Sequence, residues 1–186
     1  MSVTLDSFAV PATTAAPALT LRTWRERDVP VIVAAHADPL VRGRSPQPLT
    51  DETAVHAWFE RLDDGWAAGT LYVLAIVEGE EADADALGLI AVSRPDRESE
   101  TADVTYWTVA ERRGRAFAPR ALDAVIDWLD SEAWTDDPLR TLRLTHSGDN
   151  DAACRVAEKS GFELERELAP KTPKYPLPGH LHTRKL

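Results

Sequence analysis

One segment, residues 105–122, constrains the fold more than any other part of the chain. It reads TYWTVAERRGRAFAPRAL, so a strand-like run leads into Gly114 among arginines and then into a helix that starts near Ala118. Successive backbone N–H groups in such a turn converge on an anion, and the helix N-terminus adds about half a positive charge. Pro119 suits the first helical turn, where a missing N–H costs nothing. The segment predicts a pyrophosphate cradle, although an ordinary surface turn of an α/β protein has the same pattern.

Hydrophobic periodicity divides the rest of the chain into further strands and helices. One predicted helix, residues 25–37, carries Val29, Ile32, Val33 and His36 on one side. The helix after residue 116 has its apolar face at Ala121, Leu122, Val125, Ile126 and Leu129. The other predicted helices span residues 50–65 and 151–160, and the predicted strands span residues 19–22, 71–77, 86–92, 102–109, 139–145, 162–168 and, as an edge strand, 180–186. Residues 71–77 and 86–92 flank an acidic turn and predict an antiparallel hairpin.

Length and composition indicate one domain. The 186 residues suit a single core, which we place at residues 19–186 after a flexible arm at residues 1–18 that is rich in Ala, Thr and Pro. No apolar run approaches the ~18 residues of a membrane span, no secretory signal is visible, and the lone Cys154 suits a reducing compartment, so a cytoplasmic location is expected. A net charge of −10 argues against nucleic-acid binding and favours a cationic partner, although acidity also simply aids solubility.

The turn resembles a known family signature. The run RRGRAFAPRAL is similar to the acetyl-CoA signature of the GNAT superfamily, Q/R-x-x-G-x-G/A. Gly114 and Ala116 fill its last two positions, whereas Glu111 stands where the family has Gln or Arg. The backbone cradle does not depend on that first side chain. The resemblance implies that acetyl-CoA is the cosubstrate.

A second block lies where the same family predicts it. The run NDAACRVAEKSGF resembles N-x-A-S-x-x-x-x-x-K-x-G-F of the ribosomal-protein N-terminal acetyltransferase subgroup, with Asn150 and Lys159 at the matching positions. The resemblance implies that Asn150 hydrogen-bonds the pantetheine arm of CoA and that Lys159 approaches a CoA phosphate, a solvated lysine being the alternative. Ala153 replaces the subgroup's Ser, which removes the hydroxyl thought to protonate the leaving thiolate.

The resemblance spans about residues 19–168 and implies both fold and function. The fold is α/β (α+β): a mixed, mainly antiparallel sheet with helices on both faces, split between its fourth and fifth strands to admit CoA. The implied function is acetyl transfer from acetyl-CoA to a primary amine, of a protein N-terminus or of a small molecule, by direct attack in a ternary complex. The alternative is a noncatalytic acyl-CoA sensor or interaction module. A monomer or homodimer is expected.

Site residues follow from the same resemblance. The strand TADVTYWTV resembles the family's AEIGYWL strand, so Asp103 is the candidate general base, with a solvated strand carboxylate as the alternative and Glu100 and Glu111 as weaker rivals. A backbone N–H near Val109 is the candidate oxyanion donor. The expected CoA-binding residues are Val109, Arg112, Arg113, Gly114, Arg115, Ala116, Phe117, Ala118, Asn150 and Lys159.

The histidines near the C-terminus indicate no metal at the level of sequence. His146, His180 and His182 lack ligand spacing with other donors, and an H-x-H pair on an end strand is more often incidental than a zinc site. Cys154 is read as a small buried hydrophobe. The sequence therefore predicts a site without a metal ion.

Overall fold

The computed structural model describes residues 7–43, 45, 47–131, 134, 136–171 and 176–186. Its strands form one eight-stranded sheet in the order β1-β2-β3-β4-β5-β6-β8-β7. The described neighbouring strands pair antiparallel, except β5 and β6, which run parallel. The strands are β1 (Ser7–Val10), β2 (Leu19–Arg22), β3 (Leu71–Glu78), β4 (Ala86–Ser93), β5 (Thr101–Thr108), β6 (Thr141–Ser147), β7 (Glu163–Leu168) and β8 (Gly179–Lys185).

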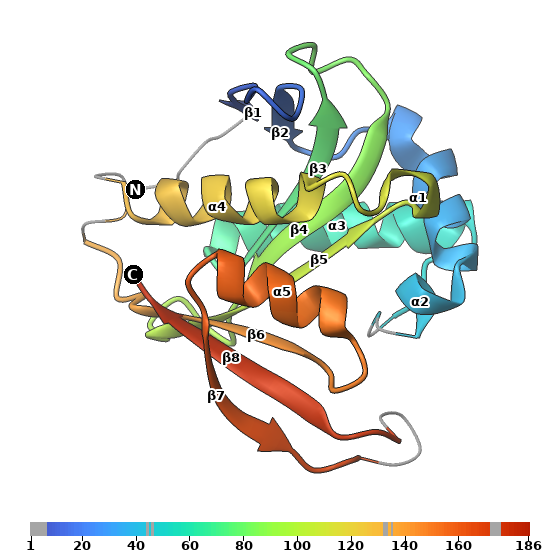
Figure 1. Ribbon diagram of the computed structural model, residues 1–186. Helices are drawn as coiled ribbons and strands as arrows, with labels where there is room; N and C mark the ends of the chain where they lie inside the picture. The colour runs from blue at the N-terminus through green and yellow to red at the C-terminus, as the bar shows by residue number, and fades with distance from the viewer. Residues whose placement is uncertain (1–6, 44, 46, 132–133, 135, 172–175) are drawn as a thin grey trace.

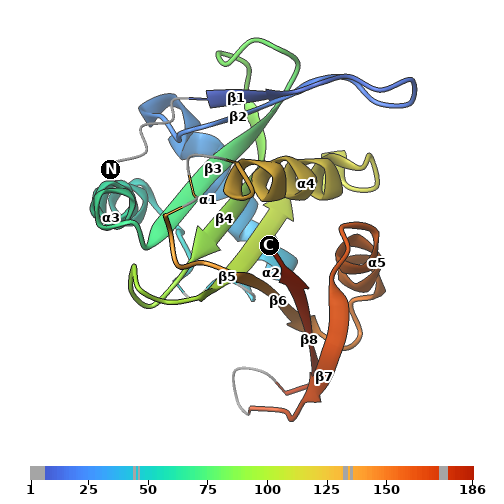
Figure 2. The same ribbon diagram turned by 90° about the vertical axis from the view of Figure 1, so that its left-hand side faces the viewer.

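Helices cover both faces of this sheet (Figures 1 and 2). One face carries α1 (Val29–Ala37), α2 (Pro39–Arg42) and α3 (Glu52–Ala68), and the other carries α4 (Phe117–Leu129) and α5 (Asp151–Lys159). Short 3-10 turns, η1 (Glu26–Asp28) and η2 (Ala110–Arg112), precede α1 and α4. The main core lies between α4 and the sheet, and the predicted apolar face of α4 is buried there. The mixed, mainly antiparallel fold with helices on both faces is confirmed.

The sheet divides between β5 and β6. These strands pair only over their first halves, from Thr101 opposite Thr141 to Val104 opposite Leu144. Beyond that point β5 stays paired with β4 as far as Thr108, and β6 stays paired with β8 as far as Ser147. Each strand therefore keeps its outer partner while the two separate from each other. This is the split that the family resemblance implies between the fourth and fifth strands.

The structure differs from the sequence expectations near both ends of the chain. Ser7–Val10, inside the expected flexible arm, form β1, because Phe8 stacks near Trp128 and Val10 is buried when the segment pairs with β2. Residues 1–6 of that arm lie outside the described part of the chain. The C-terminal strand β8 is not an edge strand, because it is inserted between β6 and β7. The edges of the sheet are therefore β1 and β7.

A buried ion pair fixes the closed end of the split. Arg94, which follows β4, donates two hydrogen bonds of 2.6 and 2.9 Å to Asp137, which precedes β6, and its Nε bonds the carbonyl of Gly69 at 2.8 Å. Burial by itself raises the pKa of Asp137, but the hydrogen bonds from Arg94 and from the Leu139 N–H outweigh it, so the pKa lies below its ordinary value. Arg94 thus joins the end of α3, the end of β4 and the approach to β6.

Asp137→Asn is expected to destabilise the fold by about 3–5 kcal/mol, because it leaves a buried guanidinium without its counter-charge. The free energy of unfolding from urea titration measures the loss. Asp103→Asn, which removes the exposed partner of an ion pair, is the matched control and should cost at most about 1 kcal/mol. Because the folded-state pKa of Asp137 is lowered, its contribution persists above about pH 4 and disappears as the pH falls through that pKa. Equal losses in the two variants would contradict a special role for the buried pair.

Candidate functional site

A cleft of about 1030 Å³ passes through the split in the sheet. Its lining includes four consecutive residues from the half of β5 that is paired with β4 but not with β6: Thr105, Tyr106, Trp107 and Thr108. Successive side chains of a strand point to opposite faces, so two of these point toward α1 and α3 and two toward α4. Because all four line the same cleft, it connects the two faces of the sheet. Two ligands that enter from opposite sides can meet in the gap.

The turn before α4 forms one wall of this cleft. Gly114 has φ of +77°, and Ala116, at the N-cap position of α4, has φ of +59°, so both adopt left-handed backbone. A Cβ added at Gly114 would meet no protein atom within 4 Å. Ala116 makes no side-chain cap, so it leaves the first N–H groups of α4 unsatisfied by capping. Left-handed backbone at a non-glycine residue costs of order 1–3 kcal/mol and is typical of ligand-binding turns.

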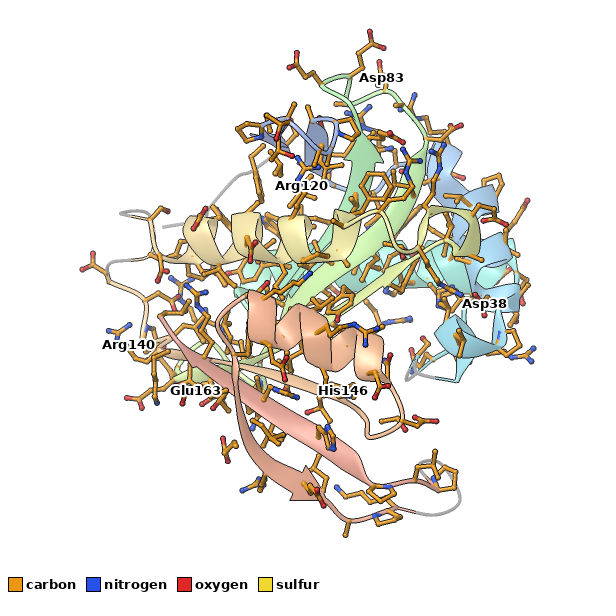
Figure 3. The ribbon with its side chains drawn as sticks, in the orientation of Figure 1. Asp38, Asp83, Arg120, Arg140, His146 and Glu163 are labelled. Atoms are coloured by element: carbon orange, nitrogen blue, oxygen red, sulfur yellow. The ribbon has the colours of Figure 1, made fainter. Side chains whose placement is uncertain are left out.

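The arginines around the turn are held by carboxylates. Arg112 and Arg115 donate to the two oxygens of Glu78 at 2.9 and 3.0 Å. Arg113 donates to Asp38, which lies at the junction of α1 and α2 (Figure 3). Arg112 and Arg113 line the cleft, whereas Arg115 does not and instead lies over the ring of Phe117 at 5.0 Å. The positive charge at this wall is therefore positioned in advance and partly compensated.

The start of α5 forms the opposite wall. Asn150 is the N-cap of α5, and its Oδ1 accepts a hydrogen bond from the Ala153 N–H at 3.3 Å. Asn150, Ala153 and Lys159 line the cleft, as do Gly114, Ala116, Phe117 and Ala118 of the other wall. The structure thus brings together most of the residues predicted to bind CoA. Ala153 presents a methyl group where the subgroup has a hydroxyl, so this position offers no proton.

The prediction for Val109 needs a correction. Its backbone N–H donates to the Leu87 carbonyl at 2.9 Å, because the pairing of β4 with the β5 chain extends one residue beyond Thr108. That N–H is therefore engaged, and Val109 is absent from the lining of the cleft. The sequence resemblance could not reveal this, because it does not show whether a given N–H of β5 points toward β4, where it is paired, or toward β6, where the split leaves it open.

Asp103 also lies elsewhere than expected. It sits on the half of β5 that is still paired with β6, directly opposite Arg143 in register. Both carboxylate oxygens accept hydrogen bonds from that guanidinium, at 2.9 and 2.8 Å, and Asp103 does not line the cleft. The geometry matches the alternative of a strand carboxylate at the surface and gives the general-base role no support.

The structure offers a histidine that the sequence analysis counted only as part of an apolar helix face. His36 on α1 is buried and lines the cleft near Trp107, with ring centroids 6.1 Å apart. Its Nδ1 lies 2.9 Å from the Ile32 carbonyl, which can only accept, so Nδ1 carries a proton and, in the neutral ring, Nε2 holds the lone pair. The signal in the sequence that could have identified this residue is a histidine at a position of the helix that is otherwise apolar. Trp58 also lines the cleft.

A second set of ionisable side chains lies outside the cleft. His146 on β6, labelled in Figure 3, and His182 on β8 are buried, and Cys154 on α5 and His180 on β8 are partly buried beside them. Burial, together with the nearby His146 and His180, lowers the pKa of His182. Burial raises the pKa of the Cys154 thiol. Among the described residues, these four are the group that could hold a metal ion.

Comparisons with known proteins agree with this geometry. Residues 18–163 match the family model described as an acetyltransferase (GNAT) domain. No curated protein matches the sequence. No helix in the described part of the chain has the length and apolar character that crossing a membrane requires.

Several solved structures share the fold at low sequence identity. RimL, a ribosomal L7/L12 alpha-N-protein acetyltransferase in complex with coenzyme A, superposes with a TM-score of 0.77 at 16% identity, over 96% of this chain and 98% of that one. The ribosomal-protein-S5-alanine acetyltransferase from Vibrio fischeri gives 0.76 at 16% identity, over 96% of each chain. The microcin C7 self-immunity acetyltransferase MccE, in complex with acetyl-CoA and AMP, gives 0.74 at 15% identity, over 90% of this chain and 92% of that one.

The family match covers most of the chain, and the superpositions cover between 90% and 96% of it. Together they confirm the resemblance that the two sequence blocks indicate. The chain belongs to the GNAT family of acetyl-CoA-dependent N-acetyltransferases.

Proposed function

We propose that this protein transfers the acetyl group of acetyl-CoA to a primary amine, which attacks the thioester directly while both substrates are bound. The observation that carries the proposal is the cleft that runs through the split sheet, with the left-handed turn before α4 on one face and partly buried tryptophans and the buried His36 on the other. Such a passage lets the thioester and the amine approach from opposite faces. No covalent acetyl-enzyme is needed, because the two reacting atoms can meet in the gap.

On the CoA side, the backbone N–H groups from Gly114 to Ala118 bind the pyrophosphate, and Arg112 and Arg113 add positive charge at its edge. Arg115 supports the turn from outside the cleft through Glu78 and Phe117. Asn150 hydrogen-bonds the pantetheine arm. Lys159 lies at the far end of α5, where it can pair with a phosphate of CoA.

On the acceptor side, we assign proton removal to His36. The attacking amine must lose a proton to hold a lone pair, and the Nε2 of the neutral His36 ring can accept that proton. The nitrogen then attacks the thioester carbon, the carbon–sulfur bond breaks, and CoA leaves as a thiolate that takes a proton from solvent. A thiol pKa of about 8.5 makes this leaving group adequate without an acid, which fits a methyl group at Ala153.

The acceptor is a primary amine of a peptide N-terminus or of a small molecule. The net charge of −10 favours cationic acceptors, and Trp58 and Trp107 supply apolar walls. RimL and the Vibrio fischeri enzyme, by their names, acetylate ribosomal proteins.

Incubating the purified protein with acetyl-CoA and a panel of N-terminal peptides, polyamines, amino acids and aminoglycosides, with mass spectrometry as readout, tests the proposal. Binding of acetyl-CoA without acetylation of any amine would instead support the noncatalytic acyl-CoA sensor, to which Ala153 and Glu111 point.

Gly114→Val is expected to weaken CoA binding at least tenfold, about 1.4 kcal/mol, because the side chain fills the open space before α4 and the backbone is strained at a φ of +77°. Isothermal titration calorimetry measures the change. Gly79→Val is the matched control, since Gly79 also has positive φ (+95°) and open space around its Cβ but does not line the cleft. If Gly114→Val stays folded and binds CoA as tightly as the control, the cradle lies elsewhere.

His36→Gln is expected to lower kcat/KM by about 100-fold or more, the usual scale for losing a general base, with CoA affinity nearly unchanged. Raising the pH should restore part of the activity, because more of the free amine is then deprotonated in solution. Asp103→Asn is the comparison variant and should retain normal turnover, since its carboxylate is engaged by Arg143 outside the cleft. The opposite pattern, a defect in Asp103→Asn and normal turnover in His36→Gln, would return the base role to Asp103.

A further inference from the structure

Four potential metal ligands meet on the side of α5 that faces away from the cleft. His146 comes from β6, Cys154 from α5, and His180 and His182 from β8. Their ligand atoms all lie within 4.8 Å of one another. None of the four lines the cleft, whereas Ala152, Ala153 and Arg155 from the same helix do.

The sequence predicts no metal because the three histidines lack the usual spacing of metal ligands along the chain. The pairing of the strands brings them together in space in spite of that spacing. β6 and β8 are adjacent and antiparallel, with His146 directly opposite His180 and with Leu144 opposite His182. His180 and His182 are two residues apart and therefore point to the same face of β8. Cys154 reaches that face from α5. Donors separated by up to 36 positions along the chain thus become neighbours.

The distances are close to those of a tetrahedral zinc site. Zn–N bonds of about 2.0–2.1 Å and Zn–S bonds of about 2.3 Å imply ligand separations of roughly 3.3 Å between nitrogens and roughly 3.6 Å between nitrogen and sulfur. The two Nε2 atoms of His146 and His182 are 3.1 Å apart. The Cys154 Sγ lies 3.2 Å from His180 Nδ1 and 3.7 Å from His182 Nε2. Small shifts suffice to complete the tetrahedron.

The hydrogen bonds around the cluster show which ring proton a cation would displace. Nδ1 of His146 lies 2.8 Å from the Ser147 carbonyl, so Nδ1 carries the proton and Nε2 offers a lone pair to the cluster. Since Nε2 of His146 holds a lone pair, its 3.1 Å contact with Nε2 of His182 is a hydrogen bond that His182 donates, and the buried Nδ1 of His182 has no hydrogen-bond partner among the described residues. Transfer of that proton from Nε2 to Nδ1 of His182 leaves both Nε2 lone pairs facing the centre of the cluster. A cation between the rings can accept a lone pair from each of them.

We propose that His146, Cys154, His180 and His182 bind a zinc ion or a similarly borderline-soft divalent cation. One thiolate and three imidazoles form a closed four-ligand set, which is the arrangement of structural and not of catalytic zinc sites. Binding releases the thiol proton to solvent. The ion joins α5 to β6 and β8 and so holds in place the helix whose other side forms a wall of the cleft. The proposal does not depend on which amine is acetylated or on which residue accepts the proton of that amine.

Co²⁺ titration of the full-length protein, purified without a histidine tag and under reducing conditions, tests the proposal. One equivalent of Co²⁺ should produce the visible bands of a tetrahedral site and a near-ultraviolet thiolate-to-cobalt band, and one equivalent of Zn²⁺ should abolish both. Cys154→Ser should lose the thiolate band, and His180→Gln should weaken binding. His56→Gln, at an exposed histidine paired with Glu26 on another part of the surface, should behave like the parent.

A thermal measurement gives a second readout that does not need activity. Zinc at about 100 times its Kd should raise the Tm of the parent and of His56→Gln by roughly 5–10 °C, and should leave Cys154→Ser unchanged. Two results would overturn the proposal. One is the absence of a stoichiometric cobalt spectrum in the parent protein. The other is a Cys154→Ser variant that is folded and binds Co²⁺ with the parent's spectrum and affinity.

Discussion

The rest of the molecule depends on the limited pairing between β5 and β6. Only the first four residues of β5 and of β6 are paired with each other, which closes the split at that end. The buried Arg94–Asp137 ion pair secures the chain next to this closed end. Beyond it, β4 holds β5 and β8 holds β6, so the second halves must separate. A continuous sheet would block passage between the two layers of helices. The separation instead opens the cleft, with the start of α4 as the wall beside β5 and the start of α5 as the wall beside β6.

The local features of the fold could be predicted from the sequence, because they depend on neighbours within a few residues. The turn at Gly114, the buried face of α4 and the hairpin of β3 and β4 are of this kind. The errors concern partners far apart in the sequence. Asp103 meets Arg143, and the Val109 N–H meets Leu87, through strand registers that no short window can reveal. The neighbours of Cys154 depend in the same way on the placement of β8 between β6 and β7.

The cleft combines a rigid wall with compensated charge. Left-handed backbone at Gly114 and Ala116 fixes the direction of the N–H groups before any ligand arrives, and Glu78 and Asp38 hold the arginines in defined orientations. Preorganisation of this kind reduces the conformational entropy lost on binding. It also means that an incoming anion must compete with carboxylates already in place. The wall therefore favours a multivalent, geometrically matched anion over a simple one.

The two edges of the sheet affect how copies of the protein can associate. An exposed strand edge can add a strand from another molecule, which leads to aggregation unless the edge is short or charged. In the described part of the chain β1 has four residues, and β7 has the sequence ELEREL, with its charged side chains exposed to solvent. Both edges therefore discourage sheet extension between molecules. A sheet of eight strands thus ends in two edges that disfavour pairing with a second copy, which leaves the helical faces and loops as the surfaces better suited to contact between molecules.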